Sequence, residues 1–354
     1  MSKLEKRESK LSSAAVVNSD LARFSKEISA LGMKPLWERV MRLKPGTAAL
    51  PAIWRWEAVR PALMRACELI TAKQAERRVL MLENPALPGT TFITTTLYAG
   101  LQAILPNEIA PTHRHTPNAL RFIMEGEGAY TAVEGERVAM RPGDFVVTPG
   151  WAWHDHGNLG SQPVAWLDGL DLAIANMMGA HFRENYPQET QPVSKRDGTS
   201  TARYGANLLP VDLRPQGPAS PILCYPYERT RAALEQLAKD GDPHPAHGWK
   251  LRYANPATGG HAFPTMAVFM QWLPRGFSGR NYRGTDGTVF CVVEGKGSID
   301  VGETRFDIAP HDVFVVPSWE IHRFAAATDC VIFSYSDRAA QEALGFWREE
   351  GAAD

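Results

Sequence analysis

Three histidines have the residue type and spacing that could bind a metal ion. His113 and His115 form an H-x-H pair in PTHRHTPNALRF, and His154 follows in PGWAWHDHG. On a β-strand, residues i and i+2 point to the same face, so both imidazoles of the pair can bind one ion. An isolated H-x-H pair lies more often on a solvated strand, so the pair indicates a metal site only together with its surroundings.

An internal repeat supplies those surroundings. The segment 122–154, FIMEGEGAYTAVEGERVAMRPGDFVVTPGWAWH, is matched by the segment 291–322, CVVEGKGSIDVGETRFDIAPHDVFVVPSWEIH. Both copies carry E-G-x-G, then a glycine in a turn, then an aspartate before an apolar run that ends in Pro, Trp and His. The repeat predicts two copies of one β-domain.

The elements that position these residues can be predicted from local patterns. From Arg78 onward, short apolar or alternating runs are broken by Gly, Pro and Asn, which is typical of an antiparallel sandwich or barrel. LARFSKEISALG and VRPALMRACELITAKQ have apolar residues at helical spacing, and ERTRAALEQLAKDG predicts one later helix. We therefore predict a mainly β protein with a helical segment 1–75, a first β-domain 76–185, a connection 186–250 and a second β-domain 251–354.

The composition excludes several classes of protein. With 354 residues, the chain can form two β-domains, each with its own core. Lys and Arg (38) balance Asp and Glu (39), so neither nucleic acid nor an anionic membrane is indicated as a partner. The four cysteines show no C-x-x-C pairing, which favours reduced thiols. Because the N-terminus is polar and no apolar run approaches about 18 residues, we expect a soluble cytoplasmic protein.

The motifs resemble those of the cupin superfamily. Its first motif is H-x-H, a spacer that often includes Glu, and Gly; its second is P-G-D, an apolar strand and P-x-x-x-H. The glutamate position would fall at Ala119 or Leu120, and neither can bind a metal. Three neutral imidazoles would leave open positions on an ion, although imidazole suits iron, zinc, copper and nickel alike. The remaining motif positions are held by His113, His115, Gly126, Pro142, Gly143, Asp144, Pro149 and His154.

Longer segments resemble a narrower family, the gentisate and salicylate 1,2-dioxygenases. They are ERRVLMLENP, LYAGLQAILPNEIAPTHRHTPNALRFIMEGEGAYTAVEGE, RPGDFVVTPGWAWHDHGN and WLDGLD. The resemblance implies a bicupin, with two double-stranded β-helix (jelly-roll) domains. It also implies one Fe(II) per subunit in the N-terminal cupin, held by His113, His115 and His154. NAD(P)H and flavin would not be needed, and the subunits would assemble as a homotetramer.

The same resemblance implies the reaction. A ring-cleaving dioxygenase of this family inserts both atoms of O2 between the carboxyl-bearing and the ortho-hydroxyl-bearing carbons of a hydroxybenzoate. We expect gentisate, with maleylpyruvate as the product. Salicylate, a 5-substituted salicylate such as 5-nitrosalicylate, and 1-hydroxy-2-naphthoate are alternative substrates, and Tyr98 and Gly100 are candidates for choosing among them. A metal cupin that is an isomerase or a binding protein, and a non-enzymatic bicupin, are alternatives of another class.

The family also implies which residues surround the substrate, namely Arg77, Gln102, Arg121, His156 and Asp168. The planar donors of arginine match a carboxylate, although Arg121 could instead pair with an internal acid. His156 would bind the substrate hydroxyl or take its proton, with a fourth-ligand role as the alternative. Asp168 would accept a hydrogen bond from an imidazole; its alternative is a turn residue.

The second copy of the repeat lacks most of the metal ligands. Alignment of EGEG with EGKG places Tyr282 opposite His113 and Gly284 opposite His115, so that only His322 is kept. One histidine does not hold a metal, and we expect the C-terminal domain to pack and shape the assembly. His244 and His247, in the Pro-rich DPHPAHGW, are predicted to lie in a loop.

Overall fold

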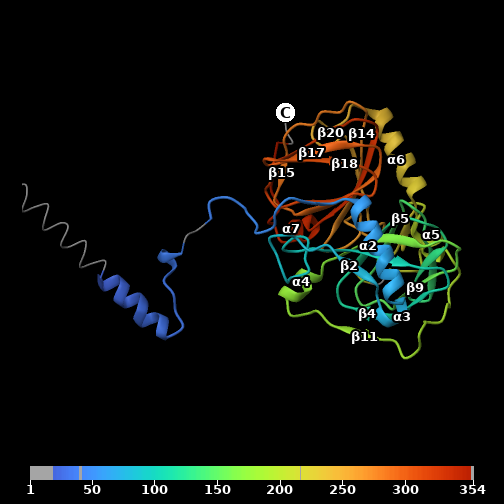
Figure 1. The fold of residues 1–354 in the computed structure, drawn as a ribbon, viewed down its shortest axis with the longest axis horizontal. Coiled ribbons are helices and arrows are strands. Elements are labelled where there is room, and N and C mark those ends of the chain that lie inside the picture. Colours follow the sequence, from blue (N-terminus) through green and yellow to red (C-terminus); the bar gives the residue numbers. More distant parts are fainter. Residues whose placement is uncertain (1–18, 40–41, 216, 352–354) are drawn as a thin grey trace, which may run out of the picture. The chain divides into compact units, whose positions relative to one another are not determined.

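The computed structural model describes residues 19–39, 42–215 and 217–351, in two units, 1–45 and 46–354. In the first unit, residues 19–30 form a helix and Leu36–Glu38 (η1) a 3-10 turn, which confirms the helix predicted there. The part of the predicted helical segment before residue 19 lies outside the described residues. The second unit contains both barrels (Figure 1).

Two antiparallel sheets form the first barrel. Its strands are β2 (Val79–Met81), β3 (Tyr98–Ile104), β4 (Ile109–His115), β5 (Ala119–Glu125), β6 (Ala129–Val133), β7 (Glu136–Ala139), β8 (Phe145–Thr148), β9 (His154–Asn158), β10 (Val164–Leu170), β11 (Arg183–Asn185) and β12 (Cys224–Tyr225). One sheet has the strand order β12-β8-β5-β10-β3-β2, and the other has the order β11-β4-β9-β6-β7.

The second barrel repeats this plan. Its strands are β13 (Trp249–Arg252), β14 (Ala267–Leu273), β15 (Arg283–Gly284), β16 (Thr288–Glu294), β17 (Gly297–Val301), β18 (Thr304–Ile308), β19 (Val313–Val316), β20 (His322–Ala326), β21 (Cys330–Ser336) and β22 (Glu349–Glu350), together with β1 (Ala52–Trp54). The large sheet has the order β1-β19-β16-β21-β14-β13, and the smaller sheets are β18-β17-β20 and β15-β22. The structure confirms the two β-domains predicted from the repeat and the bicupin that the family resemblance implies.

Short helices lie around and between the barrels. They are α2 (Trp56–Leu69), α3 (Ala72–Ala75), α4 (Leu172–Met177), α5 (Thr199–Tyr204), α6 (Tyr227–Asp240) and α7 (Arg338–Ala343). The helices predicted before residue 75 and in ERTRAALEQLAKDG correspond to α2, α3 and α6. The connection also contains the short helix α5, which was not predicted. The domain limits at residues 75, 185 and 250 stay predictions.

Each large sheet has an edge strand that comes from a segment outside its own barrel. Strand β1 precedes the first barrel in sequence but pairs with β19 of the second, and β12 of the connection pairs with β8 of the first. The prediction of a helical segment 1–75 and of a connection 186–250 with one helix includes neither strand. Runs of two or three residues are too short to show the alternation that identifies a strand, so pairing with the barrels decides their conformation.

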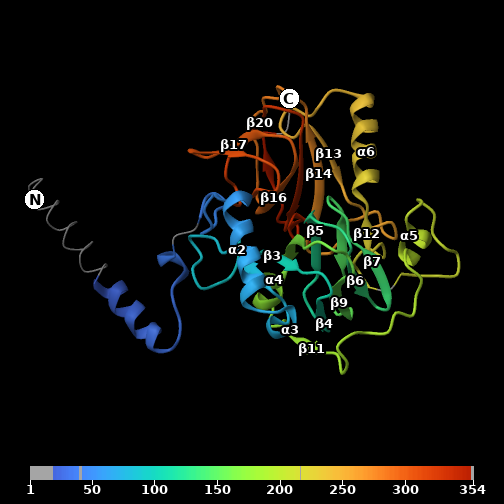
Figure 2. The same ribbon diagram turned by 45° about the vertical axis from the view of Figure 1, so that its right-hand side comes forward.

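The outer faces of the two large sheets pack against each other (Figure 2). Alternate residues of β5, Leu120 and Phe122, point away from the interior of the first barrel into a core cluster that also contains Phe333 and Tyr335 of β21. The rings of Phe122 and Phe333 stack with centroids 4.1 Å apart. The Tyr335 hydroxyl donates a hydrogen bond of 2.8 Å to the carbonyl oxygen of Tyr98. The two barrels therefore share one apolar core.

The first glycine of the repeated E-G-x-G motif has a steric explanation. Gly126 and Gly295 have positive φ angles of +85° and +77°. A Cβ atom would lie 2.1 Å from the Pro163 carbonyl oxygen at the first position and 1.9 Å from that of Asp329 at the second. Only glycine fits this backbone conformation and this close approach.

Two further predictions concern the whole chain. Cys67, Cys224, Cys291 and Cys330 are free thiols, as expected from their spacing. Within the described residues, no helix has the length and apolar character needed to cross a bilayer.

Candidate metal centre and substrate pocket

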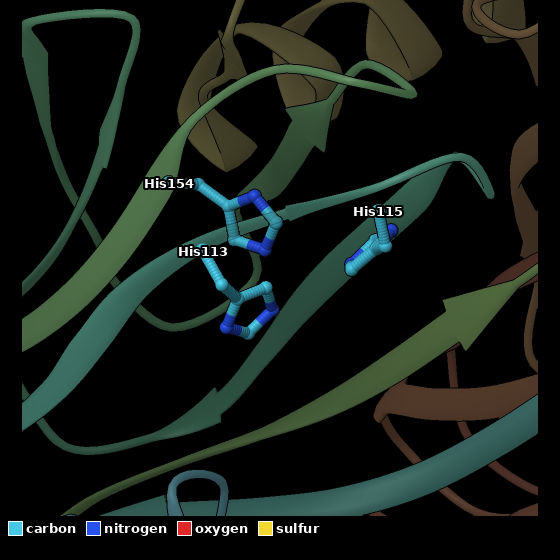
Figure 3. Close-up of side chains that lie close together, drawn as sticks. All are labelled: His113, His115 and His154. Atoms are coloured by element: carbon cyan, nitrogen blue, oxygen red, sulfur yellow. The ribbon is translucent and has the colours of Figure 1, made fainter. Parts of the chain in front are cut away.

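The three candidate ligands come together on two neighbouring strands of the first barrel. His113 and His115 lie on β4, two residues apart, and His154 begins β9, where it is directly paired with His113. A register shift between Ala110 and His113 marks a bulge in β4 just before the pair. Figure 3 shows the three imidazoles pointing toward one another.

The geometry of the imidazoles fits a metal ion. One ring nitrogen from each of the three lies within 4.8 Å of the others. Nδ1 of His115 lies 2.8 Å from the Pro117 carbonyl oxygen, and Nδ1 of His154 lies 2.9 Å from that of Ala152. Because a carbonyl oxygen only accepts, both Nδ1 atoms carry the proton and both Nε2 lone pairs are free. Nε2 of His154 is buried without a hydrogen-bond partner among the described residues, as a metal ligand would be.

Burial keeps these imidazoles neutral. It lowers the pKa of His115 to about 4, and it lowers the pKa values of His113 and His154 well below the ordinary value. Positive charge on Arg77 and Arg121 lowers all three further. Neutral imidazole is the form that binds a metal, so the site needs no proton release before it can do so.

Two arginines make the wall beside the histidines positive. Arg121, on β5, is 3% exposed; its Nη1 donates to the Thr148 hydroxyl at 2.5 Å, and its Nε lies 3.4 Å from Oδ1 of Asp168 without an aligned hydrogen bond. Arg77 donates from Nη1 to the Pro111 carbonyl oxygen at 2.9 Å. Burial and repulsion from Arg121 lower the pKa of Arg77 to about 9. An anionic ligand would relieve this repulsion.

The comparison with known proteins agrees with this site. The family model described as a cupin domain matches residues 100–170, which span both metal-ligand strands. The chain is 50% identical to gentisate 1,2 dioxygenase 1 of Aquipseudomonas alcaligenes, over 94% of this chain and 97% of that protein. The chain belongs to the gentisate and salicylate 1,2-dioxygenase family. It is therefore a ring-cleaving dioxygenase of the bicupin type.

Two more relatives support this family assignment. The gentisate 1,2-dioxygenase of a Streptomyces species is 39% identical, over 90% of this chain and 91% of its own. The crystal structure of a salicylate 1,2-dioxygenase from Pseudaminobacter salicylatoxidans is 34% identical, with a TM-score of 0.87, over 94% of this chain and 97% of that one. Both matches extend through the two cupin domains of this family member.

The other predicted substrate residues of this dioxygenase lie on the inner face of the large sheet. Tyr98, Gly100 and Gln102 alternate along β3, so they share one face. Gly100 is paired with Asp168 of β10, which places the aspartate on the same face. A Cβ atom at Gly100 would lie 2.7 Å from the Tyr98 hydroxyl oxygen, so the tyrosine ring reaches over the glycine.

Asp168 has a different partner from the one expected. We predicted that it would accept a hydrogen bond from an imidazole, or lie in a turn. It lies within β10 directly opposite Arg121 and accepts from the indole N–H of Trp166 at 3.0 Å. The antiparallel register of β5 and β10 causes this pairing, and Arg121 thus has the internal acid that was its alternative explanation.

His156 shares the face of His154, as its spacing predicts. The two rings lie 5.8 Å apart, and Nδ1 of His156 lies 2.9 Å from the Thr131 hydroxyl oxygen. That hydroxyl also lies 3.2 Å from the sulfur of Met140, to which it can donate, so it can accept from Nδ1–H of His156. The Nε2 lone pair of His156 then stays free, and this atom is buried without a partner among the described residues.

Two threonines of the site were missed in the sequence. Thr148 contacts Arg121 and Thr131 contacts His156. Each is a buried polar residue in an otherwise apolar strand, VVT on β8 and AYTAV on β6. A polar residue at an inward position of such a strand is the signal that could have identified them.

The second barrel confirms the alignment of the repeat. Tyr282 forms a β-bridge with His322, which is the same relation as that of His113 to His154. The rings of Tyr282 and His322 lie 5.5 Å apart, edge to face. His244 and His247 lie in the loop between α6 and β13, as predicted, and their rings stack at 4.8 Å.

Asp168 gives the stability of the protein a defined pH dependence. Burial raises the pKa of Asp168 to about 6, although Arg121 and the Trp166 hydrogen bond lower it. The folded protein therefore binds this proton more tightly than the unfolded chain does. The contribution of Asp168 to the free energy of unfolding decreases between about pH 4 and pH 6, by at most about 1.4 kcal/mol per pH unit, and is constant above that range.

Asp168→Asn should remove this titration. We expect the free energy of unfolding of the variant, minus that of the wild type, to increase from pH 4 to pH 6 and then to level off. Urea denaturation of both metal-free proteins measures it, since the buried histidines titrate in both and cancel in the difference. A difference that does not change with pH would contradict the raised pKa.

Proposed function

We propose that the protein is an Fe(II)-dependent gentisate 1,2-dioxygenase with one iron per subunit, held by His113, His115 and His154. Both atoms of O2 would enter between the carboxyl-bearing and the ortho-hydroxyl-bearing carbons of gentisate, giving maleylpyruvate. The main support for the proposal is the group of three converging, neutral imidazoles, two buried and one half-buried, beside two arginines. When bound there, iron would supply a Lewis acid and a place for O2.

The arginines would bind and orient the substrate carboxylate. Nε of Arg121 has no aligned acceptor, and Arg77 lies close enough to repel it. A carboxylate between these side chains gains charge-assisted hydrogen bonds on both sides. Asp168, opposite Arg121 on the neighbouring strand, keeps the guanidinium in place. This arrangement would orient the ring toward the three histidines.

His156 would take the proton of the ortho hydroxyl group. In this role the Thr131 hydroxyl accepts from Nδ1–H of His156, and Nε2 carries the free lone pair. The electron-rich ring itself supplies the electrons that reduce O2, and one oxygen atom ends on each of the two separated carbons. Because the ring supplies these electrons, the reaction would need no NAD(P)H or flavin.

Oxygen uptake by reconstituted protein tests the proposal. The protein is loaded with Fe(II) without air, and O2 uptake and the ultraviolet spectrum are followed with gentisate, salicylate and 5-nitrosalicylate in parallel. We expect one O2 per gentisate consumed and the chromophore of a ring-opened product. The absence of uptake with all three acids, in protein shown to contain iron, would disprove the dioxygenase proposal.

Salicylate is the second candidate substrate, because a salicylate 1,2-dioxygenase shares this fold and 34% of the sequence. We favour gentisate because relatives named for that substrate reach 50% and 39% identity. The cytoplasmic location and the homotetramer stay predictions.

The variant Tyr98→Phe should change the activity with gentisate and with salicylate to different extents. The Tyr98 hydroxyl reaches over Gly100 on the inner face, and we infer that it contacts the 5-hydroxyl group, which gentisate has and salicylate lacks. Loss of one hydrogen bond to a substrate hydroxyl should lower kcat/KM for gentisate about tenfold and leave kcat/KM for salicylate unchanged. Steady-state oxygen uptake with both acids measures the ratio. An equal change in kcat/KM for gentisate and salicylate would show that Tyr98 does not contact the 5-hydroxyl group.

A further inference from the structure

The second barrel contains an open cavity of about 430 Å³. Its apolar lining includes the rings of Phe269, Phe290 and Phe324. Small-molecule sites are typically concave, mostly apolar and about 300–1,000 Å³ in volume, with a few converging polar groups. The size and the aromatic walls suit a ligand with one ring.

A lysine and an amide project into this cavity from adjacent strands. Lys250 of β13 is directly paired with Gln271 of β14, so both side chains lie on the inner face. Gln271 is fully buried, and within the described part of the chain neither its amide nitrogen nor its amide oxygen has a hydrogen-bond partner. Buried amides are nearly always hydrogen-bonded, so this group is arranged for a partner that the chain does not supply.

The inner positions of the second barrel correspond to those of the first. In the first barrel, Gly100 and Arg121 are both paired with Asp168; in the second, Phe269 and Phe290 are both paired with Ser334. Gln271 follows Phe269 by two residues, as Gln102 follows Gly100. The second barrel has therefore kept the glutamine, replaced the arginine with a ring, and gained a cation at Lys250.

Lys250 is available to an anion. The described residues include no carboxylate within ion-pair distance of its Nζ, which lies 4.6 Å from the centroid of the Phe269 ring. Asp286 acts on it only at longer range and is hydrogen-bonded by the Trp347 indole, while Arg338 is paired with Glu342. Burial lowers the pKa of Lys250 to about 8, so the amine is mostly charged at neutral pH.

Two histidines of the lining, His247 and His322, are neutral. Burial lowers the pKa of His322 to about 4 and that of His247 further below its ordinary value. Nδ1 of His322 faces the Glu320 carbonyl oxygen at 3.4 Å. On its inner face the cavity thus presents the Lys250 amine, the Gln271 amide and aromatic rings. The lining also includes four further charged residues, namely Arg252, Asp240, Asp242 and Glu320.

We propose that the second barrel binds a small aromatic carboxylate, with Lys250 pairing with the carboxylate, the Gln271 amide donating a hydrogen bond to it and the ring lying among Phe269, Phe290 and Phe324. Because Tyr282 and Gly284 replace two of the three metal ligands, the molecule would be bound without being cleaved. This site is separate from the proposed metal centre and does not depend on the dioxygenase activity.

The test uses 4-fluorobenzoate, which lacks the ortho hydroxyl group and is followed by 19F NMR on the full-length protein. Lys250→Met and Gln271→Leu change the proposed site, and Lys296→Met, an exposed lysine of the same barrel, is the matched control. Arg121→Met removes the carboxylate partner of the first barrel. Thermal melting with and without the probe provides a second readout on the same proteins.

We expect Lys250→Met to weaken binding at least about tenfold, because it removes a charge-assisted contact, while Lys296→Met and Arg121→Met leave this binding event unchanged. The probe should raise the Tm of the wild type but not that of Lys250→Met. If Lys250→Met does not fold, the same comparison is made with Gln271→Leu. Absence of binding up to about 10 mM, or binding lost in Arg121→Met but kept in Lys250→Met, would overturn the proposal.

Discussion

Replacing His154 with alanine is expected to eliminate both iron binding and oxygen uptake. His154 is 1% exposed, and its Nε2 faces the other two imidazoles without another partner among the described residues. Changing a group that only hydrogen-bonds a metal ligand already lowers metal affinity about 10–100-fold, so loss of a ligand should exceed about 100-fold. We expect iron content below about a tenth of the wild-type value and oxygen uptake at least about 1,000-fold lower.

The control for this variant is a histidine outside the first barrel. His311→Asn is suitable because His311 lies in the second barrel with a positive φ of 70°, which asparagine tolerates. Iron is measured by elemental analysis after gel filtration, and activity by oxygen uptake with gentisate. Wild-type iron content in His154→Ala would show that the three histidines are not the metal site. Loss of iron in His311→Asn would show a general effect on folding.

The second large effect is expected for Arg121→Met. Arg121 has a proposed role in binding the substrate and a structural role in the ion pair with Asp168, and the two can be measured separately. Arg121→Met removes the proposed contact with the substrate carboxylate and also leaves Asp168 buried without its cation. Breaking a buried ion pair by removing one partner costs about 3–5 kcal/mol of stability. Loss of a charge-assisted contact with the substrate should lower kcat/KM about 100-fold.

The double variant Arg121→Met, Asp168→Asn tests this separation. Once neither charge is buried alone, most of the lost stability should return, because an intact buried pair and its neutral replacement often differ little. The loss of kcat/KM should persist, since the substrate carboxylate still lacks its arginine. Urea denaturation and steady-state kinetics measure the two effects. Recovery of kcat/KM in the double variant would show that Arg121 acts only by stabilising the fold.

The general plan of this fold could be predicted because local sequence patterns, namely the repeat and the alternation of strand residues, determine it. The repeat, the H-x-H pair and His154 predicted two β-domains and the convergence of three histidines, since strand alternation fixes the face on which i and i+2 lie. The roles of Asp168 and Thr148 could not be obtained in this way. They depend on which residues lie opposite each other in β5, β8 and β10, and no local pattern specifies that register.

The two edge strands β1 and β12 were not predicted, for a related reason. Strands β1 and β12 are three and two residues long, so their conformation is set by β19 and β8 rather than by their own residues. The conformation of such short segments is a consequence of tertiary contacts. The cavity of the second barrel was missed as well, because its lining combines residues that seem ordinary one at a time.

The apolar core shared by the two barrels also explains why the second copy of the repeat would be retained in evolution. Leu120 and Phe122 of the first barrel are covered by Phe333 and Tyr335 of the second. A descendant that deleted the second copy would expose this apolar face to water and destabilise the first barrel, even if its three histidines were unchanged. Selection therefore retains the outer surface of the second copy, while its interior is free to acquire another ligand.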